Sequence, residues 1–462
     1  MNTRKYIGSV QFYKTALGIA IPVMLQVLLQ NLVSLIDNFM VAGLGDIKMS
    51  GVNVTNQILF VFFVAMNTLV AGGGIFMSQY NGAKNSEGMQ QTFRYKLFSG
   101  LVLGGIAICL SVFLPNQILG LLVNKNTAGP EIIHEGKIYL GIILFTFIPI
   151  AVSAIIGSSL REIGNVRPPL YISVFATVVN TFFNWILIYG NLGAPRLEVA
   201  GAAIATVIAR VVEMLIFIVY IYIKRPPFYV RFTELLRINF TLFFSILRKS
   251  VIIFLSEMSW VMTETVMTAV YNGRGGAEIV SGMAAGWAIA NLFFLVFSGI
   301  HTSVGVIVGG TLGSNDLETA RKQARWLRTG SIVMGFIVAI FESFSVLLIP
   351  IVFGNLSVES RLLTRNMLWV IAFYMPVWTY LNAQFATARS GGDTIMGAWV
   401  DISVNLTLFL PGIFLLAMYT DLGPIEMFAI IKLTDFIKIA IASWQLRTER
   451  WLKNLTSVEI KE

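Results

Sequence analysis

The chain has 462 residues, of which 56% are hydrophobic and only 12% carry a formal charge. Water-soluble proteins average about 25% charged residues, so this composition excludes a soluble globular fold and indicates a protein of the lipid bilayer. The single cysteine and the two histidines exclude a disulfide framework and a metal site rich in Cys or His. The net charge of +9 leaves nucleic-acid binding and membrane topology as two explanations.

Twelve apolar segments are long enough to cross the bilayer, for which a helix needs about 20 residues. In chain order they cover residues 15–43, 51–78, 97–123, 138–160, 170–190, 200–223, 250–272, 282–312, 330–353, 366–388, 396–418 and 424–446. The polar start of the chain has no apolar stretch followed by a cleavage site, so we expect no removable signal peptide. The predicted fold class is an all-α membrane protein with twelve transmembrane helices.

Lysine and arginine fall mainly on one side of these spans. With the N-terminus in the cytoplasm, 23 of the 33 lie in cytoplasmic segments, 7 in outer segments and 3 within spans. Because positive residues favour the cytoplasmic side, we expect a multi-pass protein of the plasma (cytoplasmic) membrane with both termini inside. The same asymmetry accounts for the net charge, so no nucleic-acid partner is expected.

The two halves of the chain share motifs at a nearly constant spacing. "QYNGAKNSEGMQQ" (79–91) resembles "GTLGSNDLETARK" (310–322) at a shift of 231, and "REIGNV" (161–166) resembles "RSGGDT" (389–394) at a shift of 228. This order indicates an internal duplication into two pseudo-symmetric six-helix lobes, an architecture of transporters. We predict an N-lobe at residues 1–223, a cytoplasmic linker at 224–249, a C-lobe at 250–446 and a cytoplasmic tail at 447–462.

Polar side chains within the N-lobe spans form the first candidate site. Asp37 lies in the first span, and an acid at the centre of a span is costly unless it faces a partner or a wet cavity. Asn180 and Asn184 in the fifth span are four residues apart and share a helix face, and Thr206 lies in the sixth span. Together these oxygens could coordinate a cation such as Na+ or hold a protonated carboxyl. The alternative is that they are hydrogen-bonding contacts between helices.

The C-lobe offers a second set of acids. Glu257 and Glu264 are seven residues apart in the seventh span, so both lie on one helix face. Facing a cavity, they would suit a cationic substrate or a coupling ion, whereas Glu264 could instead be solvated at the outer surface. Asp401, about five residues into its span, is a weaker substrate-binding candidate. His301 is expected to be a packed neutral histidine.

Other charges within the spans are expected to have structural roles. Arg210 and Glu213 are three residues apart, a spacing that allows an ion pair within one helix. Lys432, Asp435 and Lys438 form a similar ladder in the last span.

Pro22 is the candidate conformational residue. It lies fifteen residues before Asp37 in the same span, and proline removes a backbone donor and kinks a helix. A bend that straightens when Asp37 changes its ligand would be a moving part, whereas a static bend is the alternative.

The sequence resembles the MATE (multidrug and toxic compound extrusion) transporters over nearly its whole length. The stretches that carry the resemblance are "IPVMLQVLLQNLVSLIDNFMVAGLGD", "QYNGAKN", "REIGNVRPP", "NTFFNW" and "GAAIAT" in the first half, and "LSEMSW", "GTLGSNDLETARKQAR" and "RSGGDT" in the second. The resemblance implies an antiporter that exports organic cations and other amphiphiles against entry of Na+ or H+.

The resemblance also implies roles for particular residues. The family's N-lobe cation or proton site maps to Asp37, Asn180, Asn184 and Thr206, and its acid in the seventh span maps to Glu257. Two departures stand out: some members carry an aspartate where this chain has Asn184, and no acid occurs between residues 365 and 389, where one sodium-coupled branch has an aspartate in the tenth span.

Two other functions compete with a cation antiporter. A flippase for lipid-linked precursors would favour bases in its cavity, and the candidate cavity residues here include more acids than bases. An intramembrane enzyme would need a nucleophile with its base or a metal set, and no His-x-x-x-His or GxSxG motif occurs. We therefore expect a transporter without a cofactor other than its coupling ion, a monomer whose partners are the bilayer and amphiphilic, cationic small molecules.

Overall fold

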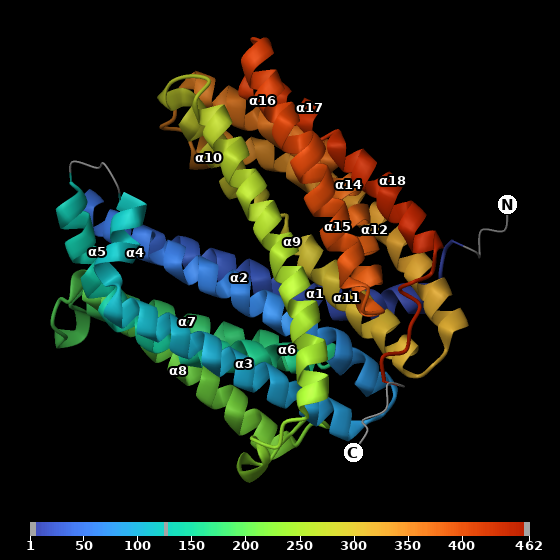
Figure 1. Cartoon of the computed structure of the whole chain (residues 1–462). Helices are drawn as coiled ribbons and strands as arrows, with labels where there is room; N and C mark the ends of the chain where they lie inside the picture. Colours follow the sequence, from blue (N-terminus) through green and yellow to red (C-terminus); the bar gives the residue numbers. More distant parts are fainter. Residues whose placement is uncertain (1–5, 124–127, 457–462) are drawn as a thin grey trace. The chain divides into compact units, whose positions relative to one another are not determined.

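The computed structural model describes residues 6–123 and 128–456, and their secondary structure is helical (Figure 1). The chain divides into two compact units, each held together by contacts among its own residues. One unit, here the N-terminal unit, comprises Leu25–Met77 and Asn85–Ser250; the other, the C-terminal unit, comprises Met1–Met24, Ser78–Lys84 and Val251–Glu462. The predicted lobe and linker boundaries stay a prediction. Arg4, Lys5, Lys125 and Lys461, which entered the charge count, and tail residues 457–462 lie outside the described residues.

The N-terminal unit is built from long helices. In chain order they are α1 (Val10–Ala42, from Leu25 on), α2 (Asp46–Gly82), α3 (Ser86–Phe113), α4 (Pro115–Val123), α5 (Gly129–Ile143), α6 (Phe147–Glu162), α7 (Arg167–Tyr189) and α8 (Glu198–Lys224). Helix α7 packs along α8, and α3 packs along α6. A short 3₁₀ turn, Leu144–Thr146, joins α5 to α6, so these two form one predicted span.

The C-terminal unit repeats this plan with more breaks. Its helices are α9 (Phe240–Asn272, from Val251 on), α10 (Ala277–Ala290), α11 (Leu295–Gly313), α12 (Leu317–Ser345), α13 (Ile349–Val352), α14 (Val358–Ser390), α15 (Thr394–Val404), α16 (Leu410–Tyr419), α17 (Pro424–Ile431) and α18 (Thr434–Arg447). A π-helical turn, Asn405–Phe409, joins α15 to α16. Helix α14 packs against α10, α11, α12 and α18 and is central to the unit.

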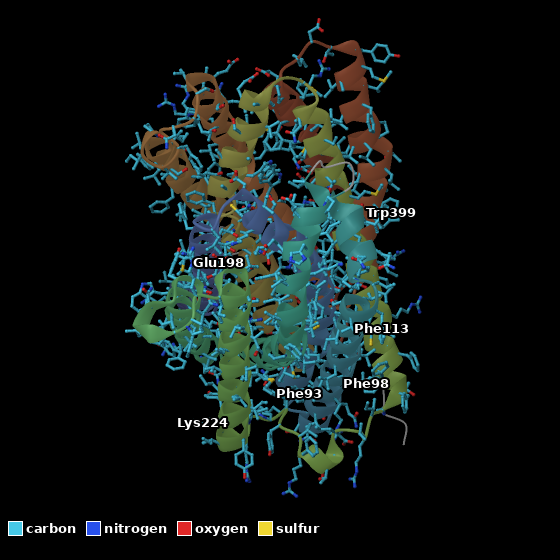
Figure 2. All side chains as sticks on the ribbon, turned by 90° about the vertical axis from the view of Figure 1, so that its left-hand side faces the viewer. Phe93, Phe98, Phe113, Glu198, Lys224 and Trp399 are labelled. Carbon is cyan, nitrogen blue, oxygen red and sulfur yellow. The ribbon has the colours of Figure 1, made fainter. Side chains whose placement is uncertain are left out.

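Nine helical stretches in the described residues are long and apolar enough to cross a membrane by length and composition. Of the twelve predicted spans, those in α9, α14 and α17–α18 fall outside this set, and these helices carry most of the charged residues of the C-terminal unit described below. Elsewhere, large apolar side chains such as Phe98, Phe113 and Trp399 lie on exposed helix faces (Figure 2). Lipid-facing helices have this character.

The turns confirm that the duplicated motifs have the same local structure. Lys84 and Asn315, which occupy equivalent positions in the first repeated motif, both adopt a positive φ (55° and 63°), and the next residue in each copy caps a helix. Asn85 accepts a hydrogen bond from the Gly88 amide at the start of α3, and Asp316 accepts one from the Thr319 amide at the start of α12. Hydrogen bonding with Thr319 holds the pKa of the Asp316 carboxyl below its usual range.

The second motif repeats in the same way. Gly164 and Gly392, at equivalent positions of its two copies, have φ values of 84° and 80°. Glycine adopts this left-handed conformation without the steric cost that other residues meet. The two copies therefore place the same turn after α6 and α14.

Several helices begin before the predicted spans that they contain. Helix α3 begins at Ser86, so Lys96, one residue before the predicted span, is a helical residue and not a loop cation. Its side chain is buried and pairs with Glu162 of α6. Glycines Gly73 and Gly74 of α2 pack against this pair so closely that a Cβ would collide with it.

Candidate functional site

The N-terminal unit brings together all four predicted polar residues, Asp37 of α1, Asn180 and Asn184 of α7 and Thr206 of α8, here called the Asp37 cluster. The Asn184 amide donates to Asp37 Oδ1 at 2.6 Å and to Asn180 Oδ1 at 3.2 Å. Asn180 lies 3.5 Å from Thr206 Oγ1 and, with its amide turned over, its nitrogen lies 2.9 Å from Asp37 Oδ1. In that orientation, which satisfies its hydrogen bonds, Asn180 donates to the Asp37 carboxylate as Asn184 does.

One oxygen of the Asp37 cluster has no hydrogen-bond partner. Asn184 is 1% exposed, and its Oδ1 is buried without a donor among the described residues. An unpaired buried acceptor is costly. Because this oxygen belongs to a cluster that already holds a carboxylate, a second amide oxygen and a hydroxyl, a cation or a proton donor would satisfy it.

Sequence reasoning missed two neighbours of the Asp37 cluster. Tyr139 of α5 is buried and lies beside Thr206. Arg210 of α8 lies within electrostatic range of Asp37 and pairs with Glu213 at 2.8 Å, as predicted from their spacing. A tyrosine in an apolar span gives no sequence signal that distinguishes it from a packing residue.

The Arg210–Glu213 pair begins a polar chain through the unit. Glu213 Oε1 accepts from Ser173 Oγ of α7 at 3.2 Å, and Ser173 Oγ accepts from Gln26 of α1 at 2.8 Å. Arg161 of α6 donates to Gln26 Oε1 at 3.2 Å. Four helices are therefore joined by hydrogen bonds that begin beside Asp37.

In the C-terminal unit each predicted acid has a basic partner from another helix. Glu257 pairs with Arg389 of α14 at 3.2 Å, and Glu264 pairs with Lys432, in the turn after α17, at 2.7 Å. The Glu264 side chain is 19% exposed.

The third acid, Asp401 of α15, accepts from Ser256 of α9 at 3.3 Å and pairs with Lys438 of α18 at 3.1 Å. Lys438 also lies 3.6 Å from Asp435. The last-span ladder was thus predicted only in part, because Lys438 has a closer partner outside its own helix and Lys432 pairs with α9.

Three further residues within the helices are Pro22, His301 and Glu342. Pro22 lies inside the continuous helix α1, two residues before the point where the two units divide. His301 is within hydrogen-bonding distance (3.0 Å) of Asn382 Oδ1, as expected of a packed histidine. Glu342 of α12 is fully buried, and both carboxyl oxygens lack a partner among the described residues.

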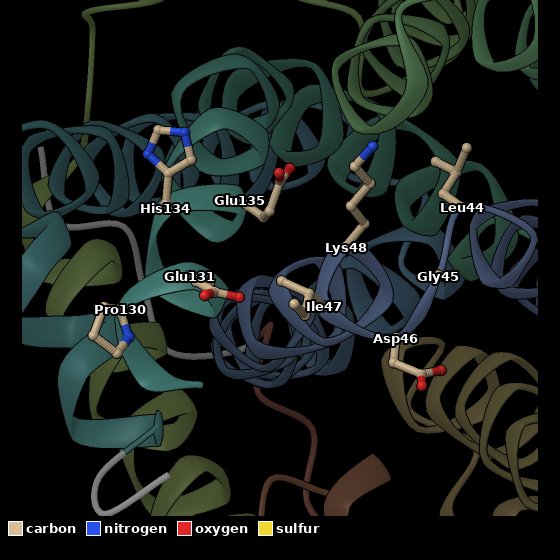
Figure 3. A pocket seen from close by; sticks show the side chains of 9 residues that line it. All are labelled: Leu44, Gly45, Asp46, Ile47, Lys48, Pro130, Glu131, His134 and Glu135. Carbon is tan, nitrogen blue, oxygen red and sulfur yellow. The ribbon is translucent and has the colours of Figure 1, made fainter. Parts of the chain in front are cut away.

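A separate cavity of about 730 Å³ lies at one end of the N-terminal unit (Figure 3). It is lined by Leu44–Lys48 at the α1–α2 turn and by Pro130, Glu131, His134 and Glu135 of α5. None of its lining residues belongs to the Asp37 cluster or to the charged pairs of the C-terminal unit. The cavity therefore does not identify either candidate site.

Comparison with known families decides the affiliation. The MatE family pattern matches residues 22–186 and again 250–414. The chain belongs to the MatE family. The second match begins 228 residues after the first (250 − 22), which is the shift found for the second repeated motif. The chain therefore contains two copies of the MatE pattern. Because members of this family are membrane transporters and not enzymes, the intramembrane-enzyme alternative is excluded.

Two relatives align with most of the chain. "Probable multidrug resistance protein NorM" of Thermotoga maritima is 24% identical over 89% of this chain and 87% of its own. The protein of the same name from Halalkalibacterium halodurans is 23% identical over 94% of both chains.

Solved structures confirm the fold. A structure titled "Outward-facing conformation of a multidrug resistance MATE family transporter of the MOP superfamily" matches with a TM-score of 0.82 at 19% identity, over 95% of this chain and 96% of that one. A MOP superfamily transporter from Pyrococcus furiosus matches with a TM-score of 0.79 at 20% identity, over 97% and 98%. The predicted all-α, twelve-helix, two-lobe fold is thereby confirmed.

Proposed function

We propose that this chain is a multidrug efflux transporter that exports amphiphilic, cationic small molecules in exchange for entering Na+ or H+. It would act as a monomer in the plasma membrane, with both termini cytoplasmic and its two lobes giving alternating access. The relatives named for multidrug resistance support the substrate class. The observation that carries the coupling role is the unpaired Asn184 oxygen beside the Asp37 carboxylate.

The Asp37 cluster supports exchange of a single monovalent ion. Its one formal charge is matched by one Na+ or one H+, and in the ion-free cluster the Asn180 and Asn184 amide nitrogens both face Asp37. With the cation bound, both amides would present oxygen; with the carboxylate free, they would donate to it. Ion binding would thereby change how α1 is held by α7, and Pro22, which removes a backbone donor from α1, would give the helix a place to bend.

Dye efflux from liposomes tests this function. Purified protein should extrude a cationic dye when an inward Na+ or H+ gradient is imposed, and imposing each gradient alone identifies the coupling ion. Asp37→Asn should abolish gradient-driven efflux, because the cluster then has no titratable or ion-pairing group. The matched control, Asp46→Asn at the exposed start of α2, should keep wild-type efflux. Unchanged efflux in Asp37→Asn would refute the coupling role.

A flippase for anionic lipid headgroups is the second candidate. The observation that favours it is the set of bases Arg389, Lys432 and Lys438 among the C-terminal acids, which reduces the excess of acids expected from the sequence. A headgroup scrambling assay on the same liposomes distinguishes the two functions, since an exporter of cations should leave labelled anionic headgroups in place.

A further inference from the structure

Lys432 occupies an environment that normally receives a ligand cation. Its ammonium lies 5.3 Å from the Phe409 ring centroid, 5.6 Å from that of Phe428 and 5.7 Å from that of Trp378, and it donates to Glu264 at 2.7 Å. Three aromatic faces and a carboxylate around one cation are the arrangement by which proteins recognise quaternary ammonium groups. We call Glu264, Trp378, Phe409 and Phe428 the aromatic cage.

The wall of the aromatic cage continues beyond the lysine. Trp287 meets Phe428 edge-on with centroids 5.9 Å apart, Phe294 meets Trp378 at 5.9 Å, and Tyr374 stacks on Trp378 at 5.8 Å. A lysine ammonium is much smaller than this aromatic surface. Because Phe409 and Phe428 are 2% and 0% exposed and belong to the core of the unit, a larger and flatter cation would reach this aromatic surface when the rings move apart.

Two irregular backbone segments meet at the cage. Phe409 ends the π-helical turn between α15 and α16, and π-helical turns are frequent at functional sites. Lys432 lies in the turn that separates α17 from α18, outside both helices. The Lys432 amide still donates to the Phe428 carbonyl at 3.2 Å, so the lysine would leave the cage by rotation of its long side chain.

The neighbouring lysine has a different environment. Lys438, also buried, is bound by the carboxylates of Asp401 at 3.1 Å and Asp435 at 3.6 Å. The Lys438 ammonium is therefore neutralised by carboxylates alone. Lys432 instead has one carboxylate and three rings, so its partners match a cationic, apolar ligand as well as they match lysine.

We propose that the aromatic cage is a binding site for organic cations and that the Lys432 ammonium is a tethered competitor, which the substrate displaces. This inference rests on the proposed export of cationic molecules and names the site where they bind in the C-terminal unit. Displacement keeps Glu264 neutralised throughout, because one cation replaces another. Lys432 returning to the cage would then help to release the substrate.

Direct binding of tetraphenylphosphonium to the purified full-length protein, measured by calorimetry, tests the proposal. Lys432→Met removes the competitor and frees Glu264, so affinity should rise roughly tenfold. Adding Glu264→Gln to this variant should reverse the gain. The matched control, Lys322→Met, should bind with wild-type affinity, because this lysine lies at an exposed position of α12 outside the cage.

A second variant decides the case if Lys432→Met does not fold. Phe409→Leu keeps an apolar residue of similar size but removes one ring, and it should weaken binding of tetraphenylphosphonium to the protein several-fold. The cage would be overturned if the wild-type protein binds tetraphenylphosphonium and exports dye, but neither variant changes the affinity. The proposed function would still stand. A wild-type protein that neither binds nor exports organic cations would refute the proposed function itself.

Discussion

The Asp37 carboxylate is the one formal charge among the four side chains of the Asp37 cluster, and this predicts its ion stoichiometry. In Asn184→Asp, a second carboxylate replaces an amide that donates to Asp37 at 2.6 Å. The two acids then repel unless a second proton or cation binds between them. We expect the number of coupling ions moved per dye molecule to rise from one towards two.

Ion and dye fluxes counted in the same liposomes measure this ratio. Asn191→Asp provides the control, because it adds an acid in the turn directly after α7, outside the cluster. A ratio that stays at one in Asn184→Asp would show that the amide is not part of the ion site.

Glu342 makes a stability prediction at the same scale. Both of its oxygens are buried without partners among the described residues, and leaving a polar group unsatisfied costs about 1–3 kcal/mol. Glu342→Met, which fills similar space with apolar atoms, should therefore unfold at a higher temperature than the wild type, by about 1 kcal/mol in stability.

The control for Glu342 is another buried glutamate. Glu213→Met removes the acceptor of Ser173 and Arg210 and should lower the unfolding temperature. Thermal unfolding of both variants in detergent gives the comparison, and a loss in Glu342→Met equal to that in Glu213→Met would mean that the Glu342 carboxyl is stabilising.

The acids of both candidate sites could be predicted from the sequence, and most of their basic partners could not. An acid inside an apolar span is conspicuous by its cost, which identified Asp37, Glu257 and Glu264. The partners of Lys432 and Arg389 lie on other helices. Residue spacing gives contacts within one helix and contains no information about which helices pack together.

Helix α1 is fastened to α7 at two points, and this gives the element a testable role. Gln26 donates to Ser173 at 2.8 Å, and three helical turns later Asp37 accepts from Asn184. If ion exchange at Asp37 breaks the Asp37–Asn184 hydrogen bond, the Gln26–Ser173 hydrogen bond decides how far α1 can bend near Pro22. Gln26→Leu should therefore slow gradient-driven dye efflux while the protein stays folded.

The control lies one turn along the same helix. Gln30 is exposed, so Gln30→Leu makes the same chemical change without breaking the polar chain. Initial efflux rates in liposomes compare the two variants, and equal rates would remove Gln26 from the mechanism.

At the scale of elements, hydropathy predicted the spans but not their breaks. The span at 396–418 contains the π-helical turn before α16, and the span at 97–123 divides between α3 and α4 at Leu114. A window average measures apolar length and is insensitive to whether the backbone ladder is continuous. Motif repeats were more informative, since Asn85 and Asp316 both cap helices as their equal positions in the two copies require.

Across the whole molecule, the two copies of the duplicated fold carry different sets of polar residues. The same turns recur at equivalent positions of the two copies, and the family pattern matches both. Yet the N-terminal copy surrounds one acid with amides and a hydroxyl, whereas the C-terminal copy pairs its acids with Arg389, Lys432 and Lys438. This divergence is what an antiporter would need if one copy binds the coupling ion and the other binds the organic cation.

The charge distribution predicts the orientation of the chain in the membrane. With 23 of 33 lysines and arginines on the side assigned to the cytoplasm, the α8–α9 connection should face inward and the α7–α8 turn outward.

Leu236 and Leu192 lie in these two connections and are 83% and 75% exposed. Replacing Cys109, the single cysteine, by serine gives a background in which Leu236→Cys and Leu192→Cys are unique reporters. A membrane-impermeant maleimide should label Leu192→Cys in intact cells and Leu236→Cys in inside-out vesicles. The opposite pattern would invert the topology, and it would then require the coupling ion to enter through the other end of the helices.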